Sequence, residues 1–227
     1  MKSIGENLWI ADGPIVYAYG FPFPTRMAVV RLEDGRLWLW SPVRLDDGLR
    51  RDISDLGRPT YAVTPNKLHH LALRQWVDAF PELSLYAPPG LARKRPDLRF
   101  SAELEDASPA AWRDEIDQVR IEGSIFMTEV FFFHRRSRTC LVGDLVQRHG
   151  DDGKTWKAWL VKLGGVGGPE GGTPRDARLT FWHRRRARAC IERALAWAPE
   201  RLVIAHGPCV LEDGTSALRR SMSWLLD

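Results

Sequence analysis

Short apolar runs separated by turn residues fill the N-terminal third of the chain. These runs predict strands over residues 7–11, 15–20, 26–32 and 36–43. The last two runs flank Asp34-Gly35, a dipeptide that is typical of a tight β-hairpin. We therefore expect an antiparallel hairpin in this part of the chain.

The next segment alternates between helical and strand patterns. Residues 45–57 predict a short amphipathic helix that ends at Gly57, because Pro59 prevents its continuation. Residues 60–64, TYAVT, predict a buried strand that leads directly into PNKLHH. Apolar residues then recur at helical spacing from 68 to 80, so His69 and His70 are expected at a strand-to-helix transition.

The second half of the chain begins with strands and ends with helices. Strands are predicted over 83–88, 117–124, 127–134, 139–146 and 201–209, and helices over 184–199 and 215–226. Residues 87–99, rich in Pro, Arg and Lys, predict a loop or an irregular helix. Residues 164–176 are rich in glycine and predict a mobile loop over one face of the protein. This loop lacks the GxGxxG and GxxxxGK[ST] motifs, so a phosphate-binding role is not favoured.

The composition is that of a globular α/β protein. The chain has 227 residues, of which 44% are hydrophobic and 27% are charged, and this size suits a single domain over 1–227. No run approaches the roughly 20 apolar residues of a membrane-spanning helix. The N-terminal residues contain no apolar stretch of the kind that a secretory signal needs. We therefore expect a cytoplasmic protein without a membrane partner.

Cysteines and charges add little specific chemistry. The three cysteines, Cys140, Cys190 and Cys209, form no CxxC pair, so buried thiols are favoured over disulfides or a zinc knuckle. The net charge is +4, and the densest arginine group, Arg184 to Arg188, stands at the start of an expected helix. A solvated helix face explains this group better than a nucleic-acid footprint, so no nucleic-acid partner is expected.

Residues that can bind a metal follow three of the expected strands. His69 and His70 follow TYAVT, Asp144 ends TCLVGD, and His206 ends RLVIAH. In α/β folds, functional side chains collect just past the carboxyl ends of strands. Three imidazoles and one carboxylate make a ligand set that suits Zn²⁺, Fe²⁺ or Mn²⁺.

With these motifs, the sequence resembles the metallo-β-lactamase superfamily over nearly its whole length. The resemblance implies an α/β fold, an αββα sandwich of two mixed β-sheets flanked by helices. TYAVT and PNKLHH are similar to the family signature in which a Thr precedes HxHxDH. The first two histidines of that signature fall on Pro65 and Lys67. Its aspartate and last histidine fall on His69 and His70.

The other family motifs are kept in part. TCLVGD resembles the strand whose aspartate bridges two metals, here Asp144, and RLVIAHG resembles the strand with the last metal-binding histidine, here His206. The strand that usually ends in an aspartate ends here in Ser41-Pro42. The upstream Gly-His motif is absent from EGSIFMTEVFFF. The chain thus resembles an uncharacterised branch of the superfamily in which PNKLHH replaces HxHxDH.

These departures imply a reduced metal site. The position that the resemblance assigns to the first metal is empty, because Pro65 and Lys67 replace its histidines. The second keeps four candidate ligands, His69, His70, Asp144 and His206, so one Zn, Fe or Mn ion is expected at most. A metal-free protein is an equal alternative, in which the Lys67 ammonium takes the place of the lost cation and pairs with Asp144.

Three functions stay open from the sequence. The first is a hydrolase in which one metal activates water and Lys67 stabilises an oxyanion, with Asp144 as the other catalytic residue. The second is an inactive lactamase-like protein that binds a small ligand in the same cleft, and the third is an iron redox protein. Each implies a small-molecule substrate or ligand. The chain contains no GxSxG or HExxH motif, which excludes a serine-hydrolase elbow and a zincin site.

Other histidines and tryptophans are weaker candidates. His134 and His149 are expected in exposed loops, and His183 is expected to be structural. Most of the ten tryptophans are expected in the core. Trp156 and Trp159, beside the glycine-rich loop, are the exception, because they offer a lining for an apolar or aromatic ligand.

Overall fold

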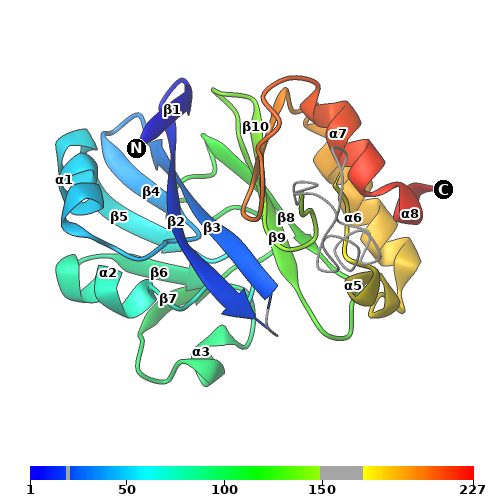
Figure 1. Cartoon of the computed structure of the whole chain (residues 1–227), viewed down its shortest axis with the longest axis horizontal. Coiled ribbons are helices and arrows are strands. Elements are labelled where there is room, and N and C mark those ends of the chain that lie inside the picture. Colours follow the sequence, from blue (N-terminus) through cyan, green and yellow to red (C-terminus); the bar gives the residue numbers. More distant parts are fainter. Residues whose placement is uncertain (19–20, 149–170) are drawn as a thin grey trace. The chain divides into compact units, whose positions relative to one another are not determined.

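The computed structural model describes residues 1–18, 21–148 and 171–227. The chain forms two compact units, Met1–Ile116 and Asp117–Asp227. In Figure 1 the first unit is coloured from blue to green and the second from green to red. The expectation of a single domain over residues 1–227 stays a prediction.

The first unit has a mixed β-sheet, which comprises seven strands within the described residues. The strand order is β1-β2-β3-β4-β5-β6-β7, antiparallel from β1 to β4 and parallel from β4 to β7. The strands are β1 (Lys2–Gly5), β2 (Leu8–Ala18), β3 (Phe21–Arg31), β4 (Arg36–Trp40), β5 (Arg58–Val63), β6 (Ser84–Ala87) and β7 (Phe100–Glu103). The helices are α1 (Asp47–Leu56), α2 (Leu73–Ala79) and α3 (Leu91–Lys94).

The core of the first unit lies between its sheet and the helices α1 and α2 (Figure 1). Successive side chains of a strand point to opposite faces, so every second residue of β3 to β6 meets these helices. Those residues include Met27, Val29, Leu37, Leu39, Ala62 and Leu85. From the helices, Ile53 and Trp76 complete the cluster, and the Trp76 indole donates to the carbonyl of Val43 at 2.7 Å.

The second unit has a mixed sheet with the order β11-β10-β9-β8 in the described part of the chain. Its strands are β8 (Ile116–Ile121), β9 (Glu129–His134), β10 (Thr139–Val142) and β11 (Arg201–Ile204). Its helices are α5 (Arg175–Leu179), α6 (Arg184–Ala196), α7 (Gly214–Ser221) and α8 (Ser223–Leu226). Strand β10 runs antiparallel to β9 and parallel to β11, and α6 and α7 pack on one face of the sheet.

Several elements differ from the sequence prediction. The strands expected over 7–11 and 15–20 are one strand, β2, while β1, β7 and α5 were not predicted. The helix expected over 68–80 begins only at Leu73, and Leu68 and Leu71 are exposed. The reason is local: the side chain of Asn66 accepts a hydrogen bond from the Leu68 amide at 2.8 Å, which favours a turn over a helix.

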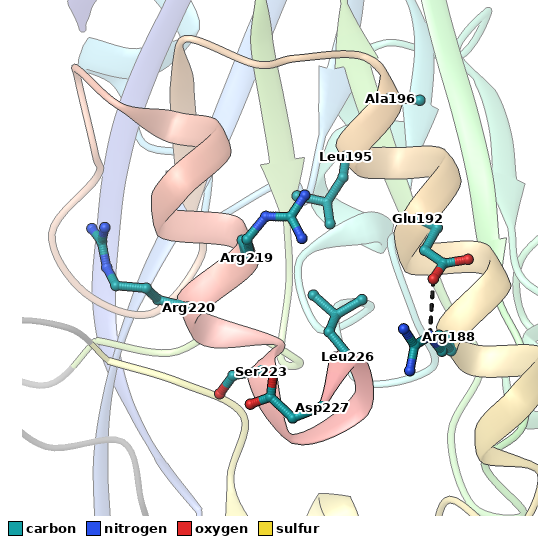
Figure 2. A pocket seen from close by; sticks show the side chains of 9 residues that line it. All are labelled: Arg188, Glu192, Leu195, Ala196, Arg219, Arg220, Ser223, Leu226 and Asp227. Atoms are coloured by element: carbon teal, nitrogen blue, oxygen red, sulfur yellow. Dashed lines mark hydrogen bonds and ion pairs between the residues drawn. The ribbon is translucent and has the colours of Figure 1, made fainter.

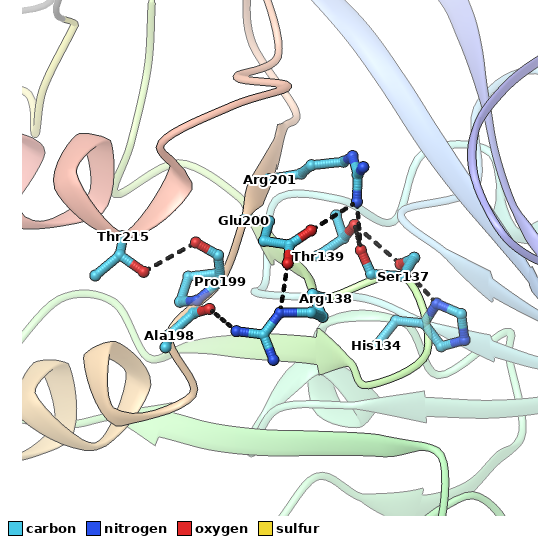
Figure 3. A network of polar contacts seen from close by, with 9 residues as sticks. All are labelled: His134, Ser137, Arg138, Thr139, Ala198, Pro199, Glu200, Arg201 and Thr215. Atoms are coloured by element: carbon cyan, nitrogen blue, oxygen red, sulfur yellow. Dashed lines mark hydrogen bonds and ion pairs between the residues drawn. The ribbon is translucent and has the colours of Figure 1, made fainter.

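The interpretation of His134 as an exposed residue is wrong. His134 ends β9 and is fully buried, and its Nδ1 lies 2.8 Å from the hydroxyl of Ser137 (Figure 3). The short β9–β10 turn folds this hydroxyl back onto the ring. A histidine beside arginines in the sequence is therefore enclosed in the structure.

Part of the glycine-rich segment can be compared with its prediction. Residues 164–170, together with His149, Trp156 and Trp159, lie outside the described residues. Gly172 exchanges two backbone hydrogen bonds with Gln147, at 2.9 and 3.0 Å, so the end of the segment is anchored rather than irregular. None of the described helices is long and apolar enough to cross a membrane.

Candidate functional site

Asp144 and His206 meet in the second unit. Val142 and Ile204 are register partners at the ends of the parallel strands β10 and β11, so the residues two positions further on lie side by side. The Asp144 Oδ1 and the His206 Nε2 are 3.0 Å apart, and both residues are buried. The structure therefore forms a close carboxylate–imidazole pair from two residues that are 62 positions apart in the sequence.

A buried glutamate fixes the backbone that carries Asp144. The carboxylate of Glu129 accepts hydrogen bonds from the amides of Gly143 at 2.9 Å, Asp144 at 2.8 Å and Leu145 at 3.2 Å. Glu129 has no exposed surface, and hydrogen bonds to a charged acceptor are stronger than neutral ones. A Cβ at Gly143 would stand 3.0 Å from the Glu129 Oε2, so the glycine leaves room for this clamp.

The segment that carries His206 is tied to the segment that follows Asp144. The Arg148 amide donates to the His206 carbonyl at 3.0 Å. Gly207 has a φ of +120°, and a Cβ there would stand 1.6 Å from the Arg148 carbonyl oxygen. Only glycine fits this close approach, which explains why a glycine follows the histidine.

The opposite end of the same sheet is held by a polar network (Figure 3). Arg201 donates to the Ser137 carbonyl at 2.8 Å, and Arg138 pairs with Glu200 at 2.8 Å. These contacts join the start of β11 to the start of β10. They fix the register in which Asp144 and His206 become neighbours.

His69 lies in the first unit, in the turn between β5 and α2. Its Nδ1 is 2.7 Å from the hydroxyl of Ser41, and its ring centroid is 6.4 Å from that of Trp40. Ser41 follows β4 with a φ of +52°, a strained conformation for a residue with a side chain. When Nδ1 carries the proton and donates it to Ser41, the lone pair of the neutral imidazole is on Nε2, where it can bind a metal.

His70 has a different environment in the same turn. Arg95 donates to the His70 Nδ1 at 3.1 Å and to the His70 carbonyl at 2.8 Å, while Asp97 holds the guanidinium. Burial, followed by the charges of Lys94 and Arg95, lowers the pKa of His70 to about 4. The ring is neutral at pH 7. Because a guanidinium can only donate, Nδ1 accepts and Nε2 carries the proton, which disfavours metal binding at Nε2.

Lys67 is half-buried and lies against the start of α3. Its Nζ is 3.0 Å from the point where a Cβ on Gly90 would stand, and its carbonyl accepts from Lys94 at 3.1 Å. Gly90 has a φ of +86° and leaves room for the ammonium. Within the first unit, the Lys67 side chain thus packs against Gly90, the residue before α3.

Sequence reasoning missed two anchoring residues. Glu129 had a weak signal, since it is a lone acid at the start of the apolar run VFFF. Arg95 had none, because it contacts His70 across 25 residues from a segment without a pattern. Ser41 was identified only as a departure from the family motif, and its contact with His69 gives it a role.

No protein-family model matches the sequence, and no curated protein matches it. The similarity to solved structures is extensive. The DIM-1 metallo-β-lactamase exposed to ceftazidime matches with a TM-score of 0.67 and 13% identity, over 99% of this chain and 95% of that one. The FIM-1 metallo-β-lactamase from Pseudomonas aeruginosa, in its mono-zinc form, matches with a TM-score of 0.64 and 14% identity, over 99% and 93%.

A protein with a different printed role also matches. The metal-soaked Flv1 flavodiiron core from Synechocystis sp. PCC6803 has a TM-score of 0.64 and 11% identity, over 98% of this chain and 60% of that one. Identities this low show the fold alone. The chain has the metallo-β-lactamase fold, and the expected two mixed sheets flanked by helices are confirmed.

Proposed function

We propose that this chain, which has the metallo-β-lactamase fold, is a metal-dependent hydrolase with a site for one metal ion. Asp144 and His206 of the second unit are proposed as two of the ligands, and the resemblance of PNKLHH to the family signature assigns His69 as a further ligand. These side chains supply one carboxylate oxygen and two imidazole nitrogens. Three protein ligands that leave a coordination position open are typical of catalytic zinc sites. A small molecule with a hydrolysable bond is the proposed substrate.

The observation that carries this proposal is the pair of Asp144 and His206. A buried carboxylate and imidazole at 3.0 Å can share a proton, and a divalent cation can replace that proton between the same two atoms. Glu129 accepts the hydrogen bond from the Asp144 amide, so the backbone that carries the Asp144 side chain is fixed while the Asp144 carboxylate is left to bind an ion. The donor set therefore fits a borderline metal such as Zn²⁺, Fe²⁺ or Mn²⁺.

Each residue has a defined part in this proposal. An ion held there supplies Lewis-acid activation of water for attack on an ester, thioester, lactone or phosphodiester. The Ser41 hydroxyl bonds to the His69 Nδ1, which fixes the orientation of the ring and leaves Nε2 as the proposed ligand atom. His70 is assigned a positioning role rather than that of a ligand, because Arg95 occupies its Nδ1. The FIM-1 enzyme, which has the same fold, was solved in a mono-zinc form, and this supports a site for one metal ion.

Metal analysis tests the proposal directly. Purified protein is expected to contain about one transition metal ion per chain, and added Zn²⁺ or Mn²⁺ should raise the melting temperature of protein treated with a chelator. His206→Ala should abolish both effects, whereas the matched control His183→Ala, which removes an exposed histidine, should not. A panel of the four substrate classes then measures hydrolysis. Activity that is unchanged in His206→Ala would contradict the mechanism.

The alternative is a metal-free protein that binds a small ligand, in which the Lys67 ammonium replaces the metal ion and pairs with Asp144. That hypothesis predicts that Lys67→Met destabilises the protein, while the wild type contains no metal and shows no thermal shift with any metal. The metal-dependent proposal predicts that Lys67→Met keeps its metal content. The proposal retains Lys67 as a candidate for stabilising an oxyanion, so this variant should lower the turnover number more than it raises KM.

A further inference from the structure

Four large apolar side chains are exposed together in the second unit. They are Ile125, Phe126, Leu179 and Trp182, and between 60% and 76% of each residue is accessible to solvent. Scattered exposed apolar residues are ordinary, but clustered ones mark an interaction surface. We call these four residues the apolar patch.

Hydrogen bonds bring the two segments of the patch together. Ser124 and Phe181 form a β-bridge, and the hydroxyls of Ser124 and Thr180 are 2.7 Å apart. The Ile125 amide donates to the Thr180 carbonyl at 3.0 Å, and the His183 amide donates to the Gly123 carbonyl at 3.1 Å. The patch is therefore a fixed surface, built from the loop before β9, the end of α5 and the loop between α5 and α6.

A row of arginines borders the apolar patch. Residues 175–186 contain five arginines and one aspartate. Arg184, Arg185 and Arg186 form the exposed first turn of α6, which His183 separates from Trp182. That turn has no acidic residue, although the positive end of a helix dipole favours acids there. Arg184 lies over the Trp224 ring, with its guanidinium 5.9 Å from the ring centroid, whereas a negatively charged partner would compensate the charges of the exposed Arg185 and Arg186 at the positive end of the helix.

A nearby cavity serves as a contrast. An open cavity of about 540 Å³ is lined by residues of α6, α7 and α8, and Figure 2 shows Arg219 pointing toward α6. Its lining carries both signs of charge, because Arg188 pairs with Glu192 at 2.9 Å and Asp227 also lines the cavity. This cavity does not favour an anionic partner in the way that Arg184 to Arg186 do.

The patch lies at a particular end of its sheet. Strand β9 begins at Glu129, and it runs antiparallel to β10, which ends just before Gly143. The loop that carries Ile125 and Phe126 precedes β9, so it lies at the sheet end that also carries Asp144 and His206. A partner on the patch would therefore approach the end of the sheet where the candidate ligands are.

We propose that the apolar patch and the arginines Arg184 to Arg186 form a docking surface for an anionic lipid bilayer. Aromatic and aliphatic side chains on loops insert into the boundary between headgroups and acyl chains, and nearby arginines pair with anionic headgroups. Ile125 and Leu179 favour lipid over nucleic acid, because aliphatic side chains do not stack on bases. The proposal concerns attachment to a bilayer surface, and it holds whether or not the chain binds a metal.

Vesicle co-sedimentation of the full chain tests this surface. The probes are neutral phosphatidylcholine vesicles and vesicles that also contain phosphatidylserine. We expect binding to the anionic vesicles that weakens between 0.1 and 0.5 M NaCl. Phe126→Ser and Trp182→Ser should each weaken it about tenfold or more, because each removes an inserted ring. Arg185→Gln with Arg186→Gln should weaken it about fivefold per charge.

The matched control is Tyr17→Ser, which removes an aromatic residue that is 75% exposed in the first unit. It should bind vesicles as the wild type does, and all variants should keep the wild-type melting temperature. Brominated lipids give a second readout, since they should quench wild-type fluorescence more than that of Trp182→Phe. Equal binding by all variants, or no binding to anionic vesicles, overturns the proposal. So does a patch-dependent dimer or nucleic-acid complex in place of vesicle binding.

Discussion

The two units present their candidate ligands in opposite ways. In the second unit, Asp144 and His206 are buried and form a pair, and a fully buried carboxylate holds the backbone beside them. In the first unit, His69 lies in a partly exposed turn, and its Nδ1 is 2.7 Å from the hydroxyl of Ser41. The pair in the second unit follows two neighbouring parallel strands, β10 and β11, whereas the turn in the first unit follows β5, an inner strand of its own sheet.

This difference indicates which of the two groups of candidate ligands tolerates substitution. Breaking the contacts of a buried charge costs a large fraction of a domain's net free energy of unfolding. The Gly-Asp and His-Gly motifs of the second unit should therefore tolerate few substitutions. In the turn of the first unit, Pro65 and Asn66 are buried, but Lys67, Leu68 and His69 are partly or fully exposed and should contribute less to folding. The motif PNKLHH, which resembles HxHxDH in position, contains these exposed residues.

The largest expected effect concerns the clamp. Glu129→Gln keeps the shape but removes the charge and turns an amide N–H toward the backbone amides of residues 143–145, so we expect a loss of about 3 kcal/mol or more. Urea unfolding followed by tryptophan fluorescence measures it. The control Glu122→Gln removes an acid that pairs with Arg120 near the surface, and it should cost less than about 1 kcal/mol. Equal losses in both variants would contradict the role of the clamp.

The next effect separates the two adjacent histidines of the first unit. His69→Ala should weaken Zn²⁺ binding by about 100-fold or more, whereas His70→Ala should weaken it by less than about tenfold, because Arg95 already occupies the His70 Nδ1. Ser41→Ala should fall between them, at roughly tenfold, since it frees the His69 ring without removing it. Competition with a chelating dye measures these affinities. A greater loss in His70→Ala would reverse the assignment.

The sequence predicted the second unit's motifs better than the first unit's. Gly143-Asp144 and His206-Gly207 each stand at the end of a strand, and each contains a glycine at a position where a Cβ would approach a neighbouring group too closely. The local sequence pattern is therefore sufficient to predict these two motifs. In residues 65–72 the apolar residues recur at helical spacing, but the Asn66 side chain accepts a hydrogen bond from the Leu68 amide and stabilises a turn instead. The contacts of Arg95 and Glu129 join distant residues, and no local pattern encodes them.

The third effect compares two thiols within the second unit. Burial, with the charge of Glu129 as a second cause, raises the pKa of the Cys140 thiol well above its usual range, while Cys209 is only half-buried. The thiolate is the reactive form. Cys209 should therefore react with a disulfide reagent such as DTNB at least about 100-fold faster than Cys140 in the native protein. Cys209→Ser identifies the fast phase, and rapid labelling of Cys140 would show that this core opens.

The smallest effect concerns the acid that holds Arg95 in the first unit. The hydrogen bonds from Arg95 lower the pKa of Asp97 to about 2, from an unfolded value near 3.8. A lowered pKa stabilises the folded state above the unfolded value, and this contribution is lost as the pH falls toward 2. Melting temperatures between pH 5 and pH 2 should thus decline less in Asp97→Asn than in the wild type. Asp55→Asn, which removes an exposed aspartate on α1, is the control. Parallel profiles for the wild type and Asp97→Asn would show that the Asp97–Arg95 pair does not stabilise the first unit, and that the turn with His70 is held without it.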